Sequence, residues 1–276
     1  MKTAIVFAAL TTLLLVGCAG ASPYLQVTGP VTGTLYQQGS LYLGKVGPGQ
    51  SFYILASAST ANASGVPINI GWDTINATQL PSGWSAQSSP LYENPMKLKV
   101  TVPSDAANGT YRLVVKAVNI QNYSRLGNLT FTAFINVTPN VFNLNVAPTS
   151  ISVGVGQPYS LKVTINNTGA SDDPFVINAQ GLPAWNVSDD VIAQHSTVST
   201  FTYPVYVNEP GIYSFNITVA SASSSLISKS YKINMVAKAS LLNDFAAVGQ
   251  GVPLSPIIYE PTYAVMLLVK YVIGAI

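Results

Sequence analysis

Apolar and polar residues alternate along much of this chain, with the two-residue period of a β-strand that buries one face. The longest run covers residues 128–137, where every second position is apolar: Leu129, Phe131, Ala133, Ile135 and Val137. The same period runs through 161–166 and 213–219. Residues 24–237 show no helical period, so the pattern predicts an all-β chain of antiparallel strands.

Turn-forming residues separate these predicted strands. They include glycine-containing turns at 47–49, 108–109, 167–169 and 209–211. Short strands at such spacing are typical of a β-sandwich. Four aromatic residues are predicted to anchor the cores, with an aromatic binding platform as the alternative: Trp84, Tyr111, Trp185 and Tyr213.

A repeat of about one hundred residues divides the pattern into two domains. Three motifs recur in the same order: Val46-Gly-Pro-Gly-Gln50 as Val153-Gly-Val-Gly-Gln157, Leu80-Pro81 before Trp84 as Leu182-Pro183 before Trp185, and Gly109-Thr-Tyr111 as Gly211-Ile-Tyr213. A shared order at a nearly constant spacing indicates a duplicated domain. We therefore expect two tandem β-sandwiches, over residues 24–139 and 140–237.

The order of these motifs resembles the immunoglobulin-like modules of archaeal and bacterial surface proteins, including modules attached to some glycoside hydrolases. The likeness covers residues 40–138 and 141–237 and implies two immunoglobulin-like antiparallel β-sandwiches. In composition the chain also resembles archaeal S-layer stalk subunits and glycosylated surface filaments, although it lacks the long coiled coil that such stalks often carry. These likenesses imply an archaeal envelope protein, but a shared fold does not define a function.

Asn-x-Ser/Thr triplets are unusually dense, and they indicate an extracellular location with N-linked glycans. With 20 Asn and 50 Ser plus Thr in 276 residues, chance gives about 4 triplets. The chain has nine, at Asn62, Asn76, Asn108, Asn122, Asn128, Asn136, Asn166, Asn186 and Asn216. Strand parity predicts that Asn128, Asn136, Asn166 and Asn216 point away from the core. Six triplets lie in the first domain and three in the second, which favours the second domain as the one with a bare surface for a partner.

The N-terminus has the features of a signal peptide over residues 1–21. A positive start precedes an apolar run from Ala4 to Val16 and the small residues Ala19-Gly20-Ala21. The one cysteine, Cys18, lies in a Leu-Val-Gly-Cys sequence that resembles a lipobox, which implies a lipid anchor on Cys18. The alternative is that Cys18 is removed with the signal peptide. In both cases the mature domains contain no disulfide.

Residues 238–276 depart from the repeat, with a linker at 238–261 and a hydrophobic tail at 262–276. As a helix this tail would span about 22 Å, against a bilayer core of about 30 Å, and it contains Lys270. A membrane anchor is one interpretation. A strand donated to the sheet of a neighbouring subunit is a second, and packing on the chain's own second domain is a third.

Charge and chemistry exclude several classes of function. Only 12 basic and 10 acidic residues are present, so we expect neither a nucleic-acid partner nor a polybasic membrane patch. His195 is predicted to lie on the surface between strands, and the doublets Asp172-Asp173 and Asp189-Asp190 in solvated loops, although calcium is the alternative for the doublets. No cofactor, metal site or catalytic site is predicted.

These features together predict a non-enzymatic, glycosylated cell-surface protein with a structural or adhesive role of the S-layer-associated type. Its expected partners are other envelope components or like subunits, and the membrane through the tail or a lipid on Cys18. One alternative is a carbohydrate-binding accessory module, which needs exposed aromatic residues such as Trp72, Phe134 and Tyr203. A second alternative is a surface-filament subunit that assembles by strand donation.

Overall fold

The computed structural model describes residues 23–61, 67–120, 126–183 and 187–239. Every regular element in these ranges is a β-strand, and among them no helix is long and apolar enough to cross a membrane. The chain forms two compact units. The second unit runs from Ile135 and also includes Leu43–Phe52 and Thr101–Tyr111, so the units do not follow the sheets residue by residue. The domain limits expected from the repeat stay a prediction.

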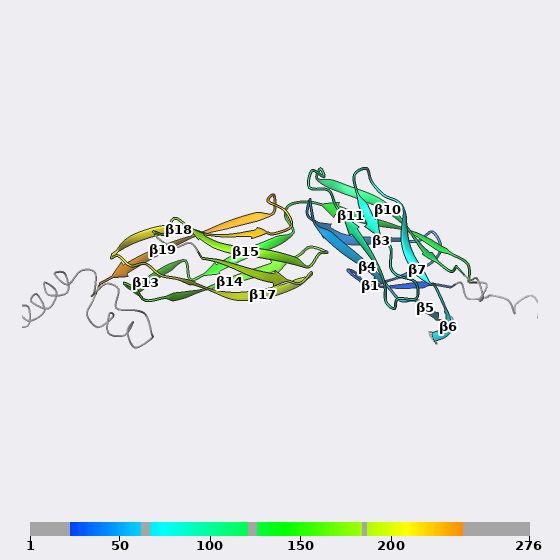
Figure 1. Cartoon of the computed structure of the whole chain (residues 1–276), viewed down its shortest axis with the longest axis horizontal. Helices are drawn as coiled ribbons and strands as arrows, with labels where there is room; N and C mark the ends of the chain where they lie inside the picture. The colour runs from blue at the N-terminus through cyan, green and yellow to red at the C-terminus, as the bar shows by residue number, and fades with distance from the viewer. Residues whose placement is uncertain (1–22, 62–66, 121–125, 184–186, 240–276) are drawn as a thin grey trace, which may run out of the picture. The chain divides into compact units, whose positions relative to one another are not determined.

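The strands from β1 to β11 form the first sandwich (Figure 1). Its five-stranded sheet has the order β2-β1-β4-β9-β8, with β1 Leu25–Gly29, β2 Gly33–Leu35, β4 Ser51–Ala56, β8 Ser85–Gln87 and β9 Met96–Thr101. Its four-stranded sheet has the order β3-β11-β10-β7, with β3 Ser40–Val46, β7 Thr74–Gln79, β10 Gly109–Val118 and β11 Leu129–Val137. A separate hairpin pairs β5 Ser59–Ala61 with β6 Pro67–Gly71.

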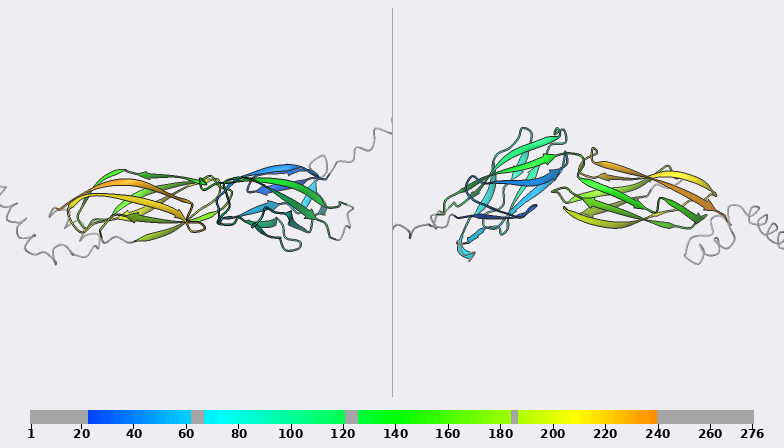
Figure 2. Two further views of the ribbon diagram at one scale, coloured as in Figure 1. Left: turned by 90° about the horizontal axis from the view of Figure 1, so that it is seen from above. Right: turned by 180° about the vertical axis from the view of Figure 1, so that it is seen from behind.

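The strands from β12 to β19 form the second sandwich, whose two sheets are visible in both views of Figure 2. Its three-stranded sheet has the order β12-β14-β17, with β12 Phe142–Ala147, β14 Tyr159–Asn167 and β17 Thr197–Val205. The order of its five-stranded sheet is β13-β19-β18-β15-β16, with β13 Ser150–Gly154, β15 Asp173–Gln180, β16 Ser188–Ala193, β18 Gly211–Ser221 and β19 Ser228–Lys238. Strand β13 pairs with β19 in parallel, whereas the pairs β12–β14, β14–β17, β15–β16, β15–β18 and β18–β19 are antiparallel.

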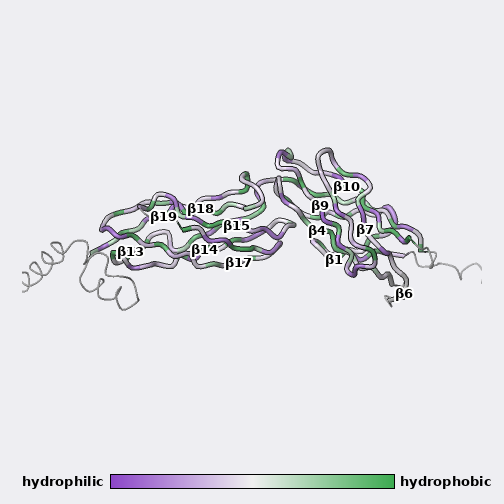
Figure 3. Tube along the Cα trace, in the orientation of Figure 1, coloured by the Kyte–Doolittle hydropathy of each residue, from purple (hydrophilic) through white to green (hydrophobic). Residues whose placement is uncertain are grey.

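Alternation of buried and outward side chains builds both cores, as the sequence predicts. Strand β11 buries each of its five alternating apolar residues, and the trace in Figure 3 alternates between hydrophobic and hydrophilic residues along the strands. In the second sandwich, side chains from both sheets form one cluster around Phe142 and Phe175, whose ring centroids are 4.8 Å apart. The fold class is therefore confirmed as all-β, with two immunoglobulin-like sandwiches.

The repeated motifs occupy equivalent places in the two sandwiches. The Gly-x-Gly-Gln motif forms the turn between β3 and β4 and again the turn between β13 and β14. The Leu-Pro motif follows β7 in one copy and β15 in the other. Trp84 is buried as expected, while Trp185 lies outside the described residues. The motifs therefore mark the same turns between corresponding strands in the two sandwiches.

Tyr111 and Tyr213, which were expected to anchor the cores, are only half-buried, and Tyr213 packs against the core cluster of the second sandwich. Each lies near the start of a strand, and its hydroxyl donates a hydrogen bond to a backbone carbonyl four residues earlier: Tyr111 to Ala107 and Tyr213 to Glu209, both at 2.9 Å. This is the tyrosine corner of immunoglobulin-like folds. The Tyr213 ring packs against the core of its sandwich, while its hydroxyl holds the incoming loop.

We expect Tyr213→Phe to lower the free energy of unfolding by about 1 kcal/mol, because it deletes one intramolecular hydrogen bond and keeps the ring. Urea denaturation measures the change. Tyr231→Phe is the matched control, since the Tyr231 hydroxyl bonds to no described residue and its ring is also half-buried. Equal losses in the two variants would show that the corner bond contributes nothing.

Candidate functional site

The asparagines of the nine predicted glycan sites do not enter the cores in the part of the chain that the structure describes. Asn108, Asn128 and Asn216 are exposed, and Asn76, Asn136 and Asn166 are half-buried. The strand parity expected for four of them holds. Asn136, Asn166 and Asn216 each lie between two buried residues of their strand, and Asn128 directly precedes the buried Leu129. Asn62, Asn122 and Asn186 lie outside the described residues. The three exposed sites leave room for a glycan on the outer surface, whereas the amide oxygen of Asn76 is buried without a hydrogen-bond partner. Glycosylation of all these sites stays a prediction.

The sites are distributed over the sheets in a way that the count per domain does not reveal. Asn166 lies on the central strand β14 of one sheet of the second sandwich, and Asn216 on the central strand β18 of the other. In the first sandwich, Asn76 and Asn136 lie on the sheet β3-β11-β10-β7. None of the five strands of the sheet β2-β1-β4-β9-β8 carries a site. One sheet of the first sandwich thus carries no predicted glycan site on its strands, and the bare surface expected in the second domain stays a prediction.

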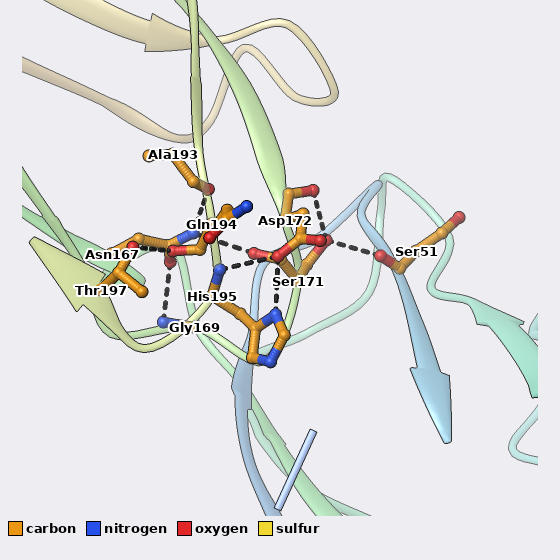
Figure 4. Close-up of polar contacts among 9 residues, drawn as sticks. All are labelled: Ser51, Asn167, Gly169, Ser171, Asp172, Ala193, Gln194, His195 and Thr197. Atoms are coloured by element: carbon orange, nitrogen blue, oxygen red, sulfur yellow. Dashed lines mark hydrogen bonds and ion pairs between the residues drawn. The ribbon is translucent and has the colours of Figure 1, made fainter. Parts of the chain in front are cut away.

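The doublet Asp172-Asp173 lies at the start of β15, where neighbouring side chains point to opposite sides of the strand. Asp172 points outward, as expected. Its Oδ1 accepts one hydrogen bond from the backbone N–H of His195 at 2.7 Å and a second contact from the ring Nδ1 at 2.6 Å (Figure 4). The pair connects the loop before β15 to the turn between β16 and β17.

Two opposing effects act on the Asp172 carboxyl. Partial burial raises its pKa, but the hydrogen bonds from His195 and the charge of its ring together outweigh burial and hold the pKa below the ordinary value of 3.8. Both partners are largely exposed, so the pair adds little to stability. His195 is on the surface as predicted, and its contacts with Asp172 hold the turn between β16 and β17 against the loop before β15.

Asp173 is only 1% exposed, so its predicted position in a solvated loop is wrong. Its Oδ1 accepts hydrogen bonds from the hydroxyls of Ser221 and Ser223, both at 2.9 Å, and its Oδ2 accepts one from Nε2 of Gln50 at 2.6 Å. All four residues belong to the second compact unit. Burial raises the pKa of Asp173 above 3.8, and these hydrogen bonds offset part of that effect.

Asn167 organises the same loop from inside. It is buried, its Nδ2 donates to the carbonyls of Ser171 and Ala193, and its Oδ1 accepts from the N–H of Gly169, each at 2.9 Å (Figure 4). Both N–H donors of this amide and one acceptor position of its oxygen are therefore satisfied. The adjacent Asn166 points outward, so one of two neighbouring asparagines braces the loop and the other is the predicted glycan site.

The second doublet, Asp189-Asp190, lies on strand β16 and not in a loop, which corrects the prediction. β16 is an edge strand, and Asp189 shares the inward side with the buried Val191 and Ala193. An inward charge on an edge strand discourages pairing with another chain. Within the described ranges, no three His, Cys, Asp or Glu side chains gather as a metal site.

The aromatic residues proposed for carbohydrate binding do not form a platform. Trp72 is 3% exposed and Tyr203 is fully buried, while Phe134 is half-buried on β11. The Tyr203 hydroxyl accepts from the N–H of Ala179 and donates to the carbonyl of Val187. Trp72 and Tyr203 are therefore core residues, and their assignment to a sugar-binding face is wrong.

Sequence reasoning missed Asp173 and Asn167 as bracing residues. Strand parity places both on the inward side, beside Ile165 and Phe175, but the partners of Asp173 lie up to 123 positions away along the chain, so no local pattern indicates them. Tyr203 did have a usable signal, because Phe201, Tyr203 and Val205 alternate with Thr200, Thr202 and Pro204. Residue Cys18 and the tail 262–276 lie outside the described residues.

Neither a protein-family model nor a curated protein matches the chain. Among solved structures, the chain is similar to fibronectin(III)-like modules of Clostridium thermocellum CbhA, at 12% identity over 78% of this chain and 94% of that chain, with a TM-score of 0.28. It is similar to a chimeric titin Z1Z2 at 17% identity over 80% and 100%, with a TM-score of 0.36. For the Yersinia pseudotuberculosis adhesin InvE the values are 12%, 78%, 60% and 0.26. Likenesses at these TM-scores say nothing about what the chain does.

Proposed function

We propose that this chain is a non-enzymatic, glycosylated cell-surface protein with a structural or adhesive role, of the S-layer-associated type. It is held at the envelope by its tail or by a lipid on Cys18. The observation that supports this most is that every described glycan-site asparagine lies in a loop or on the outward face of a strand. A glycosyltransferase needs access to the side-chain amide, and a core is not disrupted by sugars at such places.

The surface chemistry supports the same proposal. Only 8% of the residues are charged, so solubility depends on neutral polar side chains and on the sugars. The buried polar network around Asp173 and the pair of Asp172 with His195 connect loops, and neither has a substrate-sized arrangement of reacting groups around it. These features fit a structural module better than a catalytic one.

We expect the native protein to lose mass when its N-linked glycans are removed, measured by intact mass spectrometry. Asn216→Gln removes one glycan, because residue 216 is exposed on the central strand β18. Asn178→Gln on the adjacent strand β15 is the matched control, since Asn178 lies opposite Thr218 but does not begin a triplet. A native protein with no mass change, from a source that glycosylates, would overturn the proposal. Mapping of the two ends of the native chain identifies the anchor.

A further inference from the structure

The sequence contains one Asn-Gly pair, Asn108-Gly109, among its 20 asparagines. Asn108 lies in a bend with its side chain exposed, and Gly109 begins strand β10. The φ of Gly109 is 155°, which residues with a side chain rarely adopt, and a Cβ added there would meet nothing within 4 Å. Both residues belong to the second compact unit. The chain directly after Asn108 therefore carries no side chain and has open space where one would lie.

An asparagine side chain can react with the backbone that follows it. The nitrogen of the next residue loses its proton to hydroxide and attacks the side-chain Cγ. The bond from this nitrogen to Cγ forms, the bond from Cγ to Nδ2 breaks, and Nδ2 takes a proton from water and leaves as ammonia. The product is a five-membered succinimide ring. Water then adds to one of the two ring carbonyls and opens the ring to aspartate or isoaspartate, so water is the only co-reactant.

Asn108 is better placed for this reaction than the other two exposed glycan-site asparagines. Ring closure requires the attacking nitrogen to come within about 3–3.5 Å of Cγ, and a side chain on the following residue crowds that approach. Gly109 has no side chain and the greatest freedom of backbone rotation. Asn128 and Asn216 precede the buried Leu129 and Ile217. Strand β18 is paired on both sides at Ile217, so its backbone cannot turn toward the side chain of Asn216.

The reaction competes with glycosylation, because both use the same side chain. Asn108 begins the triplet that ends at Thr110. A glycan is attached to Nδ2 and hinders the approach to Cγ, whereas deamidation before glycosylation removes the acceptor nitrogen. A copy of the chain without the sugar at this site is therefore open to the reaction.

The site adjoins the tyrosine corner of Tyr111. The carbonyl of Ala107, directly before Asn108, accepts the hydrogen bond from the Tyr111 hydroxyl at 2.9 Å. Isoaspartate carries the main chain through the side-chain carbon, which adds one atom to the backbone between Ala107 and Gly109. The loop that the corner holds must then change its conformation.

From these observations we infer that Asn108 is a site of spontaneous deamidation and isoaspartate formation, and that a glycan on Asn108 protects it. The modification goes beyond the proposed function, because the unglycosylated chain undergoes it without any sugar. Only the protection rests on the proposed function.

The experiment uses the full chain, made in a host without N-glycosylation and incubated in water labelled with heavy oxygen, in a constant non-ionic detergent. Peptide mapping should find labelled aspartate and isoaspartate at residue 108, formed about tenfold faster or more than at Asn128 or Asn216. The rate should rise with pH, because the attacking nitrogen must lose its proton. Asn108→Gln is the control and should take up no label at this position on the same timescale. Equal rates at the three asparagines, or no label at residue 108, would overturn the inference.

The protection is tested with Thr110→Ala made in the native host, since this variant loses the triplet and keeps the Asn-Gly pair. Thr110 is exposed, so the substitution leaves the core intact. The variant should take up label at residue 108, and the glycosylated wild type should not. Equal labelling of the two would refute the protection. A native protein without glycans would refute the proposed function and leave the deamidation of the unglycosylated chain standing.

Discussion

Phe175→Ala is expected to lower the free energy of unfolding by about 3–5 kcal/mol, among the largest effects of any single change in the second sandwich. The Phe175 side chain is fully buried on β15 and packs against the Phe142 ring of the opposite sheet. Truncation to alanine leaves a cavity and removes a tilted aromatic contact that holds the two sheets together. Urea denaturation with hydrogen exchange of the β18 amides assigns the loss to this sandwich.

Val198→Ala is the control for this prediction, because the side chain is largely exposed on β17 and its removal should change the free energy of unfolding by less than about 0.5 kcal/mol. If Phe175→Ala cost no more than Val198→Ala, the contact between the sheets would not be what stabilises the sandwich.

Asp173→Ala is expected to cost about 2–3 kcal/mol at neutral pH, because it leaves Ser221, Ser223 and Gln50 without their shared acceptor. Asp173→Asn keeps the shape and one acceptor oxygen, and removes the buried charge. We therefore expect the asparagine variant to be clearly more stable than the alanine variant in urea denaturation. Equal stabilities would mean that the network needs no acceptor at this position.

The pH dependence gives an independent check with a definite sign. The pKa of Asp173 is raised in the folded protein, so the folded state takes up this proton before the unfolded state does as the pH falls. The cost of the buried carboxylate is present above the folded pKa, and it disappears as the pH falls through that value towards about 3.9. The stability of Asp173→Asn relative to wild type should therefore be highest at neutral pH and fall in acid.

The neighbouring Asp172 has the opposite sign. Its pKa is lowered in the folded protein, so its contribution is present above about 3.9 and is lost as the pH falls through the folded pKa. Asp172→Asn should remove this acid-labile part, which is small because the pair with His195 is exposed. The pKa values of these two adjacent aspartates thus shift in opposite directions, since His195 stabilises the carboxylate of one and burial disfavours that of the other.

Local periodicity predicted strands and their buried faces well, because the two-residue period depends only on neighbouring positions. Strand β11 and the central parts of β14 and β18 follow directly from it. The repeat predicted equivalent turns for the same reason, since Gly-Gln and Gly-x-Tyr each act within a few residues. The prediction for Tyr203 was wrong because it used the residue type and ignored the strand alternation. Tyr203 was assigned to a sugar-binding face because it is aromatic, although the alternation with its neighbours predicts that it is buried, as it is.

The loop network could not be predicted, because it depends on residues distant along the chain. A carboxylate is expected to be exposed unless paired, and nothing near Asp173 shows that two serines 48 and 50 positions away will pair with it. The distribution of glycan sites over sheets has the same origin. Which strands share a sheet is decided by topology, so a count of sites per domain does not reveal that the strands of one sheet of the first sandwich carry none.

The parallel pairing of β13 with β19 has a mechanical consequence. The register runs from Ser150 opposite Asn234 to Gly154 opposite Lys238. The start of β13 and the end of β19 therefore lie at opposite ends of the paired segment. Tension applied to the start of β13 and the end of β19 pulls the strands past each other along their length. The hydrogen bonds of the pair then share the load and must break together, which slows forced unfolding, a process governed by the unfolding rate. A domain loaded at these two points would resist forced unfolding through this one pair of strands.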